Sequence, residues 1–176
     1  MKIGVEGITD SIKPTIASSL APYVEQVYCC SLDFATVAVL QRIYGAFNQY
    51  LISQPPPAGA FTSVMYTTNG HCSFLLPESA IGLTTKIIVL NMPRIQALQL
   101  SNRPDVHALW PTLLEELFHS LYNIQDETDV KHLVVQVLRL EFENVEFQQL
   151  YAPVVDRWGN CMFALSAQSR AKANKK

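Results

Sequence analysis

The chain has 176 residues and a formal net charge of −2, with 49% hydrophobic and 16% charged residues. This balance excludes an intrinsically disordered chain, and seven glycines with ten prolines exclude a collagen-like one. No apolar run reaches the ~18 residues of a membrane span, and the N-terminus, with Glu6 and Asp10, lacks the continuous apolar core of a signal peptide. We therefore expect a cytoplasmic protein with a single domain over 1–166 and no membrane partner.

Strands and helices alternate in the N-terminal third of the chain. We expect a strand over 2–7, a helix from Thr9 or Asp10 to about Leu20, a strand over 24–32 and a long helix over 34–53. In the long helix apolar residues recur at helical spacing, and Asp33 before it is a typical N-cap residue. The proline-rich segment 54–60 ends this helix and is the place for any sub-boundary within the domain.

The next segment indicates β-structure. The dipeptide Asn69-Gly70 separates two apolar runs, 61–68 and 71–76, and it suits the two positive φ angles of a type I′ turn. We therefore predict a hairpin here. The nearly all-apolar run 85–91 predicts a third, central strand.

The C-terminal half indicates two helices and a late hairpin. The helices are expected from 103–105 to Tyr122 and from about 127 to 140, and the hairpin from 151–155 paired with 161–165. The whole chain is therefore expected to be an α+β fold, with a small antiparallel or mixed sheet and three to four helices.

The end of the chain, 167–176, is expected to be a disordered basic tail. Four of the 13 basic residues lie in 170–176, which leaves nine basic residues against all 15 acidic ones in the rest of the chain. This acidic body argues against a nucleic-acid partner, which would need a basic surface. The four cysteines contain no Cys-x-x-Cys pair, so we expect free thiols and no thiolate zinc site.

One segment, 115–146, concentrates acidic residues. It holds eight of the 15 acids, opposed only by Lys131 and Arg139, and it includes the run Glu115-Glu116-Leu117-Phe118-His119. Glu115 and His119 are four residues apart, so on a helix they share one face, and two ligands at that spacing reach one metal ion. Glu116 beside that face is placed to act on a metal-bound water.

This run resembles the His-Glu-x-x-His helix of zincin metallopeptidases, with Glu115 where the family has its first histidine. The apolar strand 86–90 before it, and Asp126-Glu127-Thr128-Asp129 opening the next helix, are similar to the glutamate-type (gluzincin) branch. The resemblance covers about residues 86–140 and implies a zincin-like helix pair at 104–140. It implies His119 and Glu115 as metal ligands, Glu127 or Asp126 as the third ligand, and Glu116 as general base.

The carboxylate at 115 changes the expected chemistry of such a site. Two carboxylates and one imidazole form a harder ligand set, which shifts the preference from Zn towards Mn or Fe(II). More negative charge on the metal also makes its bound water less acidic. The resemblance therefore implies an altered or degenerate metal site, in a peptidase that is weakly active or inactive.

Other interpretations stay open. The acidic segment 115–146 is also typical of a non-catalytic interaction or regulatory protein that binds a peptide or protein partner, with Trp158 as an anchor. The pairs Glu116/His119 and Asp129/His132 match the spacing of di-iron carboxylate bundles. In the simplest interpretation the charged residues are the solvated face of an amphipathic helix. Metal content discriminates between these alternatives, and the sequence does not indicate an oligomeric state.

Overall fold

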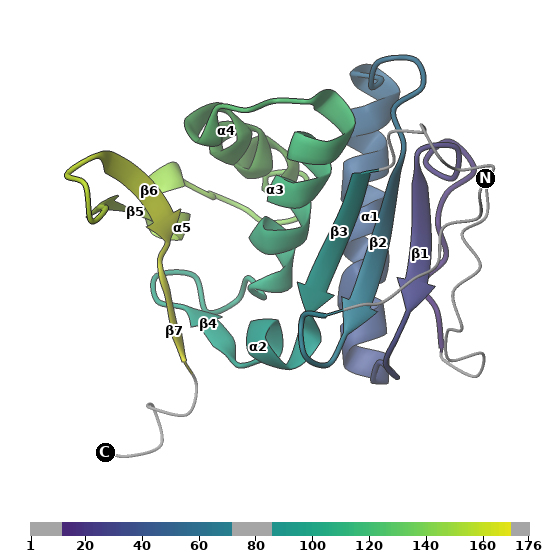
Figure 1. Cartoon of the computed structure of the whole chain (residues 1–176), viewed down its shortest axis with the longest axis horizontal. Helices are drawn as coiled ribbons and strands as arrows, with labels where there is room; N and C mark the ends of the chain where they lie inside the picture. The colour runs from purple at the N-terminus through teal and green to yellow at the C-terminus, as the bar shows by residue number, and fades with distance from the viewer. Residues whose placement is uncertain (1–11, 72–85, 170–176) are drawn as a thin grey trace.

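Three parallel strands form the largest sheet in the described part of the chain (Figure 1). The computed structural model describes residues 12–71 and 86–169. The strands β1 (Val24–Tyr28), β2 (Thr62–Thr67) and β3 (Lys86–Asn91) lie in the order β1-β2-β3. In register, Val24 pairs with Thr62 and Thr62 pairs with Lys86. All six residues of β2 are buried, as expected for the central strand of a parallel sheet.

The predicted hairpin at Asn69-Gly70 is wrong. Both edges of β2 pair in parallel, with β1 and with β3, so β2 has no edge left for an antiparallel partner. Most of the proposed second strand, 72–76, lies outside the described residues. Of the two turn residues only Gly70 has a positive φ, +76°, and the Asn69 side chain instead accepts a hydrogen bond from the backbone N–H of His71 at 2.9 Å. The two long-range parallel pairings therefore override the local turn signal.

The helix predicted to end near Leu20 is also not formed over the part that is described. Residues 12–17 have no regular structure, and 18–23 form a turn. The backbone N–H and C=O of Thr15 both bond to the side chain of Gln41, at 2.5 and 2.9 Å. These backbone groups are thus satisfied by a distant side chain rather than by a helix of their own. The strand predicted over 2–7 lies outside the described residues.

The long helix α1 (Phe34–Ser53) is confirmed at its predicted bounds. The Asp33 carboxylate accepts a hydrogen bond from the Thr36 backbone N–H at 2.7 Å, as an N-cap residue does. The helix runs behind the sheet in Figure 1 and buries its apolar side against it. Within that interface the Tyr44 and Tyr66 hydroxyl groups lie 2.6 Å apart.

Removing the Asp33 cap, by Asp33→Ala, is expected to lower the free energy of unfolding by about 1 kcal/mol at neutral pH. The Thr36 backbone N–H holds the pKa of Asp33 below its usual value. A carboxyl with a lowered folded pKa stabilises the protein above its unfolded pKa, and this contribution is lost as pH falls through the folded pKa. Urea unfolding should therefore show a smaller difference from wild type at about pH 2 than at pH 7. Asp33→Asn, which keeps a neutral cap, is the control, and a pH-independent deficit of Asp33→Ala would contradict the explanation.

The rest of the chain supplies short strands and the remaining helices. These are α2 (Met92–Gln96), β4 (Leu98–Leu100), α3 (Leu109–Tyr122), α4 (Glu127–Leu138), α5 (Phe147–Leu150), β5 (Tyr151–Val155), β6 (Cys161–Leu165) and β7 (Ala167–Ser169). The predicted α+β class is confirmed, and so is the late hairpin, because β5 and β6 pair in antiparallel fashion. In Figure 1, α3 and α4 lie between the parallel sheet and this hairpin.

Two boundaries differ from the prediction. Helix α3 begins at Leu109 rather than at 103–105. Before it the chain forms turns, in which the Arg103 guanidinium binds the Asp105 carboxylate with N–O distances of 2.7 and 2.9 Å. The start of the segment expected as a tail also differs from the prediction. Strand β7 brings 167–169 into an antiparallel pair with β4, and residues 170–176 lie outside the described part of the chain.

The core joins α1, α3 and α4 to the inner face of the sheet. Its centre is aromatic, because the ring of Phe118 lies 5.4 Å from Phe47, 5.2 Å from Tyr50 and 5.5 Å from Tyr122, measured between centroids. Among the described helices, none combines the length and the hydropathy that crossing a bilayer requires. The described cysteines (Cys29, Cys30 and Cys161) form no disulfide, and Cys72 lies outside the described residues.

Candidate functional site

The predicted site falls where α3 and α4 meet. Asn123 ends α3 in the left-handed conformation, with a φ of 55°, and Asp126 caps α4 three residues later. This short connection turns the chain back, so that the side chains of Glu115 and His119 on α3 lie close to the first turns of α4.

Five side chains form one polar cluster, which we call the Lys131 cluster. Its members come from α3, α4 and β5 and are Glu115, His119, Glu127, Lys131 and Tyr151. The Lys131 ammonium lies 2.5 Å from a carboxylate oxygen of Glu127 and 3.9 Å from one of Glu115. The other oxygen of Glu115 accepts a hydrogen bond from the Tyr151 hydroxyl at 2.7 Å. The cation that lies between the two carboxylates is therefore a lysine of the same chain.

His119 connects the cluster to the turn between the helices. Its Nδ1 lies 2.7 Å from the carbonyl oxygen of Ile124, and its Nε2 lies 3.2 Å from the Glu127 carboxylate. A carbonyl oxygen only accepts, so Nδ1 carries the hydrogen in this contact. The ring is thus oriented with Nε2 towards Glu127. A hydrogen bond from the other ring nitrogen orients metal-binding histidines in the same way.

The pKa values of the cluster are shifted by burial and by hydrogen bonds within it. Burial raises the pKa of Glu115, although the Tyr151 hydroxyl and the Lys131 ammonium favour its ionised form. The hydrogen bond from Lys131 lowers the pKa of Glu127, whose side chain is 57% exposed. Burial, with the neighbouring Glu115 carboxylate, raises the pKa of the Tyr151 hydroxyl. Lys131 itself is 4% exposed, so its charge depends on these carboxylates for compensation.

The side chains do not fit the metal site that the zincin resemblance implies. Lys131 already supplies the positive charge between Glu115 and Glu127, and a metal ion there would face the ammonium. Asp126 accepts hydrogen bonds from the backbone N–H groups of Thr128 and Asp129, at 2.8 and 2.9 Å, which is the role of a cap. In the described part of the chain, no three His, Cys, Asp or Glu side chains are grouped so that they could hold a metal ion.

The di-iron alternative also lacks its geometry. His132 stacks on the ring of Phe147, with centroids 4.6 Å apart, and it makes no metal-holding group with Asp129 or with α3 in the described ranges.

Glu116, the predicted general base, is exposed and lies outside the Lys131 cluster. It lines a groove of about 290 Å³ between β3 and the C-terminal half of α3, which we call the β3–α3 groove. The lining residues are Lys86, Ile87 and Ile88 of β3, Glu116, His119 and Ser120 of α3, and Asn123 and Gln125 of the turn. The Lys86 ammonium donates to the Asn123 side chain at 2.9 Å and thereby joins β3 to the end of α3.

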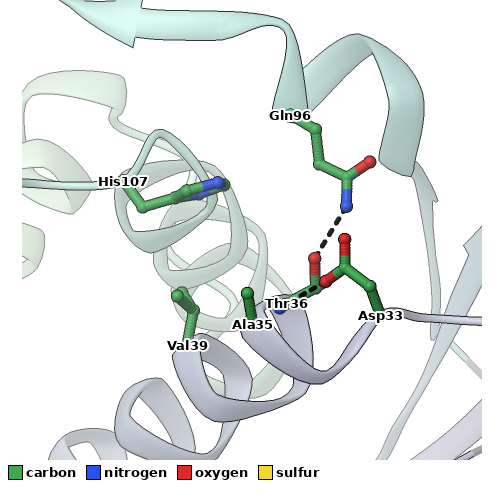
Figure 2. Close-up of a pocket in the computed structure, with 6 residues that line it drawn as sticks. All are labelled: Asp33, Ala35, Thr36, Val39, Gln96 and His107. Atoms are coloured by element: carbon green, nitrogen blue, oxygen red, sulfur yellow. Dashed lines mark hydrogen bonds between the residues drawn. The ribbon is translucent and has the colours of Figure 1, made fainter.

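A second cleft, of about 330 Å³, lies at the carboxyl ends of the parallel strands (Figure 2). Its polar residues follow β1 (Asp33, Thr36), β3 (Gln96) and β4 (His107). The Gln96 amide donates to the Thr36 hydroxyl at 2.7 Å, and Thr36 also donates its backbone N–H to Asp33. The Nδ1 of His107 accepts from the Leu109 backbone N–H at 3.1 Å at the start of α3. Of these bonds, the one from Gln96 to Thr36 connects α2 to α1, and the other two are local bonds at the starts of α1 and α3.

This second cleft is not predicted from the sequence. The sequence indicates Asp33 only as an N-cap residue, and it does not single out Gln96 or His107 as site residues. A signal for the cleft is available in the polar residues that follow β1 and β3. Parallel strands end at the same edge of a sheet, so residues that follow them lie close together. The hairpin prediction concealed that arrangement.

Trp158, the predicted anchor, lies in the turn of the β5–β6 hairpin and is 72% exposed. The Arg157 guanidinium lies 4.0 Å from the centroid of its indole ring. The Asp156 carboxylate holds the turn by accepting from the backbone N–H groups of Trp158 and Asn160, at 2.8 and 2.9 Å. The hairpin tip thus presents an exposed aromatic side chain on an ordered turn.

Comparisons of the chain with protein-family models, with curated protein sequences and with solved structures find no match. The resemblance to zincins therefore stays a prediction from the run 115–119 and its surroundings.

Proposed function

We propose that the protein is a non-catalytic interaction protein that binds a basic segment of a protein partner. The binding region is the acidic surface formed by Glu116 of α3 and by Asp126, Glu127 and Asp129 at the start of α4. The supporting observation is that some carboxylates of this region are paired with a cation and others are not. Lys131 compensates the inner carboxylates, whereas Glu116, Asp126 and Asp129 are exposed and form no ion pair with any described residue.

The position of these acids has two physical consequences. Asp126, Glu127 and Asp129 at the start of a helix are favoured by its dipole, which explains their contribution to folding. Glu116 has no such role, because it lies in the middle of α3, away from the first turn in which the dipole favours acids. Exposed carboxylates of one sign attract and orient a basic partner during encounter, mainly through a faster association rate.

A direct test uses a fluorescein-labelled hexalysine peptide as the probe. Saturable binding to the wild-type protein is expected, weaker at 200 mM than at 50 mM salt because exposed charges are screened. The double variant Glu116→Lys/Asp129→Lys should lose at least about tenfold in affinity. Glu143→Lys, an exposed acid elsewhere in the same segment, is the matched control and should lose little. Equal binding of a hexaglutamate peptide, or no binding of hexalysine, would refute the proposal.

Metal content tests the peptidase alternative. Because Lys131 lies between the carboxylates, we expect less than stoichiometric Zn, Mn and Fe in the purified wild-type protein and in the Glu115→Ala and His119→Ala variants alike. Elemental analysis measures this directly, and added Zn²⁺ or Mn²⁺ should leave the melting temperature unchanged. Stoichiometric metal in the wild type that is lost in both variants would restore the metal-site interpretation.

A further inference from the structure

Strand β3 has an unpaired outer edge in the described sheet, because the strand order is β1-β2-β3. The Thr62 and Thr67 hydroxyl groups of β2 donate to the carbonyl oxygens of Lys86 and Leu90, at 3.0 and 2.9 Å. Backbone groups of alternate residues point to opposite sides of a strand, so the N–H and C=O groups of the intervening residues 87 and 89 face the outer edge. An edge of this kind is a template for a further strand.

The groove beside this edge contains a buried polar group with no partner. Ser120 is one of the residues that line the β3–α3 groove, it is only 9% exposed, and its buried hydroxyl makes no hydrogen bond in the described structure. A serine inside a helix ordinarily bonds to the carbonyl one turn earlier. Leaving a buried hydroxyl without a partner is unfavourable, so such a group indicates a position where a ligand atom bonds.

The charge of the groove selects a basic ligand. The groove lies at the C-terminal end of α3, the negative end of its dipole, and Glu116 adds an exposed carboxylate. The one lysine of the lining is already engaged, because the Lys86 ammonium donates to the Asn123 side chain and contacts the His119 carbonyl oxygen at 3.4 Å. The lining therefore offers negative charge to a ligand and little free positive charge.

We infer that the β3–α3 groove binds a basic segment of a protein partner in the extended conformation, as an added strand along the edge of β3. The backbone of the segment pairs with residues 87 and 89, a lysine or arginine side chain lies against Glu116, and a polar atom of the segment bonds to the Ser120 hydroxyl. This inference rests on the proposed function, which supplies the acidic surface and the basic partner. It adds the strand that does the pairing and the conformation of the ligand.

The probe for this inference is a labelled hexapeptide of alternating lysine and valine. Its matched control is the same peptide with backbone N-methyl groups on alternate residues, which removes the donors on one edge. Binding of the first peptide should protect the backbone amides of Ile87 and Val89 from hydrogen exchange. The amides of Ile88 and Leu90, which face β2, should change little. The N-methylated peptide should bind at least about tenfold more weakly.

Two variants separate the side-chain contributions. Ser120→Ala should weaken the lysine–valine peptide roughly fivefold without lowering the melting temperature of the free protein, because its hydroxyl has no partner there. Glu116→Lys should weaken it by about tenfold or more, while Glu143→Lys changes it little. A Ser120→Ala variant that binds as tightly as wild type removes the hydroxyl from the proposed site.

The outcomes distinguish this inference from the proposed function. Equal binding of the N-methylated peptide, or protection on α4 without protection of Ile87 and Val89, overturns strand addition. If hexalysine still binds in a manner that depends on Glu116 and Asp129, the acidic surface remains as the proposed function. Failure of both basic peptides to bind overturns both proposals.

Discussion

Replacing Lys131 by methionine is expected to lower the free energy of unfolding by about 3 kcal/mol at pH 7. The substitution keeps the length of the side chain and removes the ammonium, which leaves the largely buried Glu115 carboxylate without a cation. Breaking a buried charge pair on one side costs roughly 3–5 kcal/mol. The exposed Glu127 adds less than about 1 kcal/mol because solvent screens it. Urea unfolding of the wild type and the variant measures the difference.

The pH dependence of this loss has a definite sign. The pKa of Glu127 is lowered by Lys131, so the wild type loses that contribution as pH falls through the lowered pKa. The pKa of Glu115 is raised, and without the ammonium its ionised form becomes less favourable still, so the variant gains stability as Glu115 takes up a proton. Both effects make the difference in free energy of unfolding between the wild type and Lys131→Met smaller at acidic pH. A gap that is equal at pH 7 and pH 4 would contradict this account.

A double variant provides the control. Lys131→Met with Glu115→Gln removes both charges and keeps an acceptor for the Tyr151 hydroxyl. It should be more stable than Lys131→Met alone by about 1–2 kcal/mol, because no uncompensated charge stays buried. If the two substitutions instead add their separate losses, Lys131 and Glu115 do not form the unit described above.

Replacing Phe118 by alanine should have the largest effect of any single change discussed, about 4 kcal/mol. Phe118 is fully buried, and its ring is in edge or tilted contact with Phe47, Tyr50 and Tyr122. Truncating a buried phenylalanine removes its transfer free energy and leaves a cavity, at a cost of roughly 3–5 kcal/mol. Phe118 of α3 packs against Phe47 and Tyr50 of α1, so its truncation weakens the interface between these two helices.

The same substitution at an exposed phenylalanine is the matched control. Phe34 at the start of α1 is 75% exposed, and Phe34→Ala should change the free energy of unfolding by less than about 0.5 kcal/mol. Phe118→Leu, which fills much of the volume, should cost clearly less than Phe118→Ala. Similar losses for Phe34→Ala and Phe118→Ala would mean that the aromatic cluster does not carry the expected stability.

Local signals along the chain predicted several elements well. The bounds of α1, its Asp33 cap and the β5–β6 hairpin follow from helical periodicity, a capping residue and a short turn, all of which involve neighbours in sequence. The zincin resemblance left Glu127 and Asp126 as alternatives beside Glu115 and His119. The turn between the helices decides between them, because it places Glu127 at 3.2 Å from His119, whereas Asp126 caps α4.

The tertiary structure decided the rest. The pairing of β2 with β1 and β3 spans long stretches of chain, and it overrode the turn signal at Asn69-Gly70. The role of Lys131 also depended on tertiary packing. Its spacing from Glu127 predicts an ordinary surface pair, and only the docking of α3 and β5 buries the ammonium beside Glu115 and Tyr151. Sequence spacing determines which groups share a helix face, whereas packing across elements determines which of them lose water and which ion compensates them.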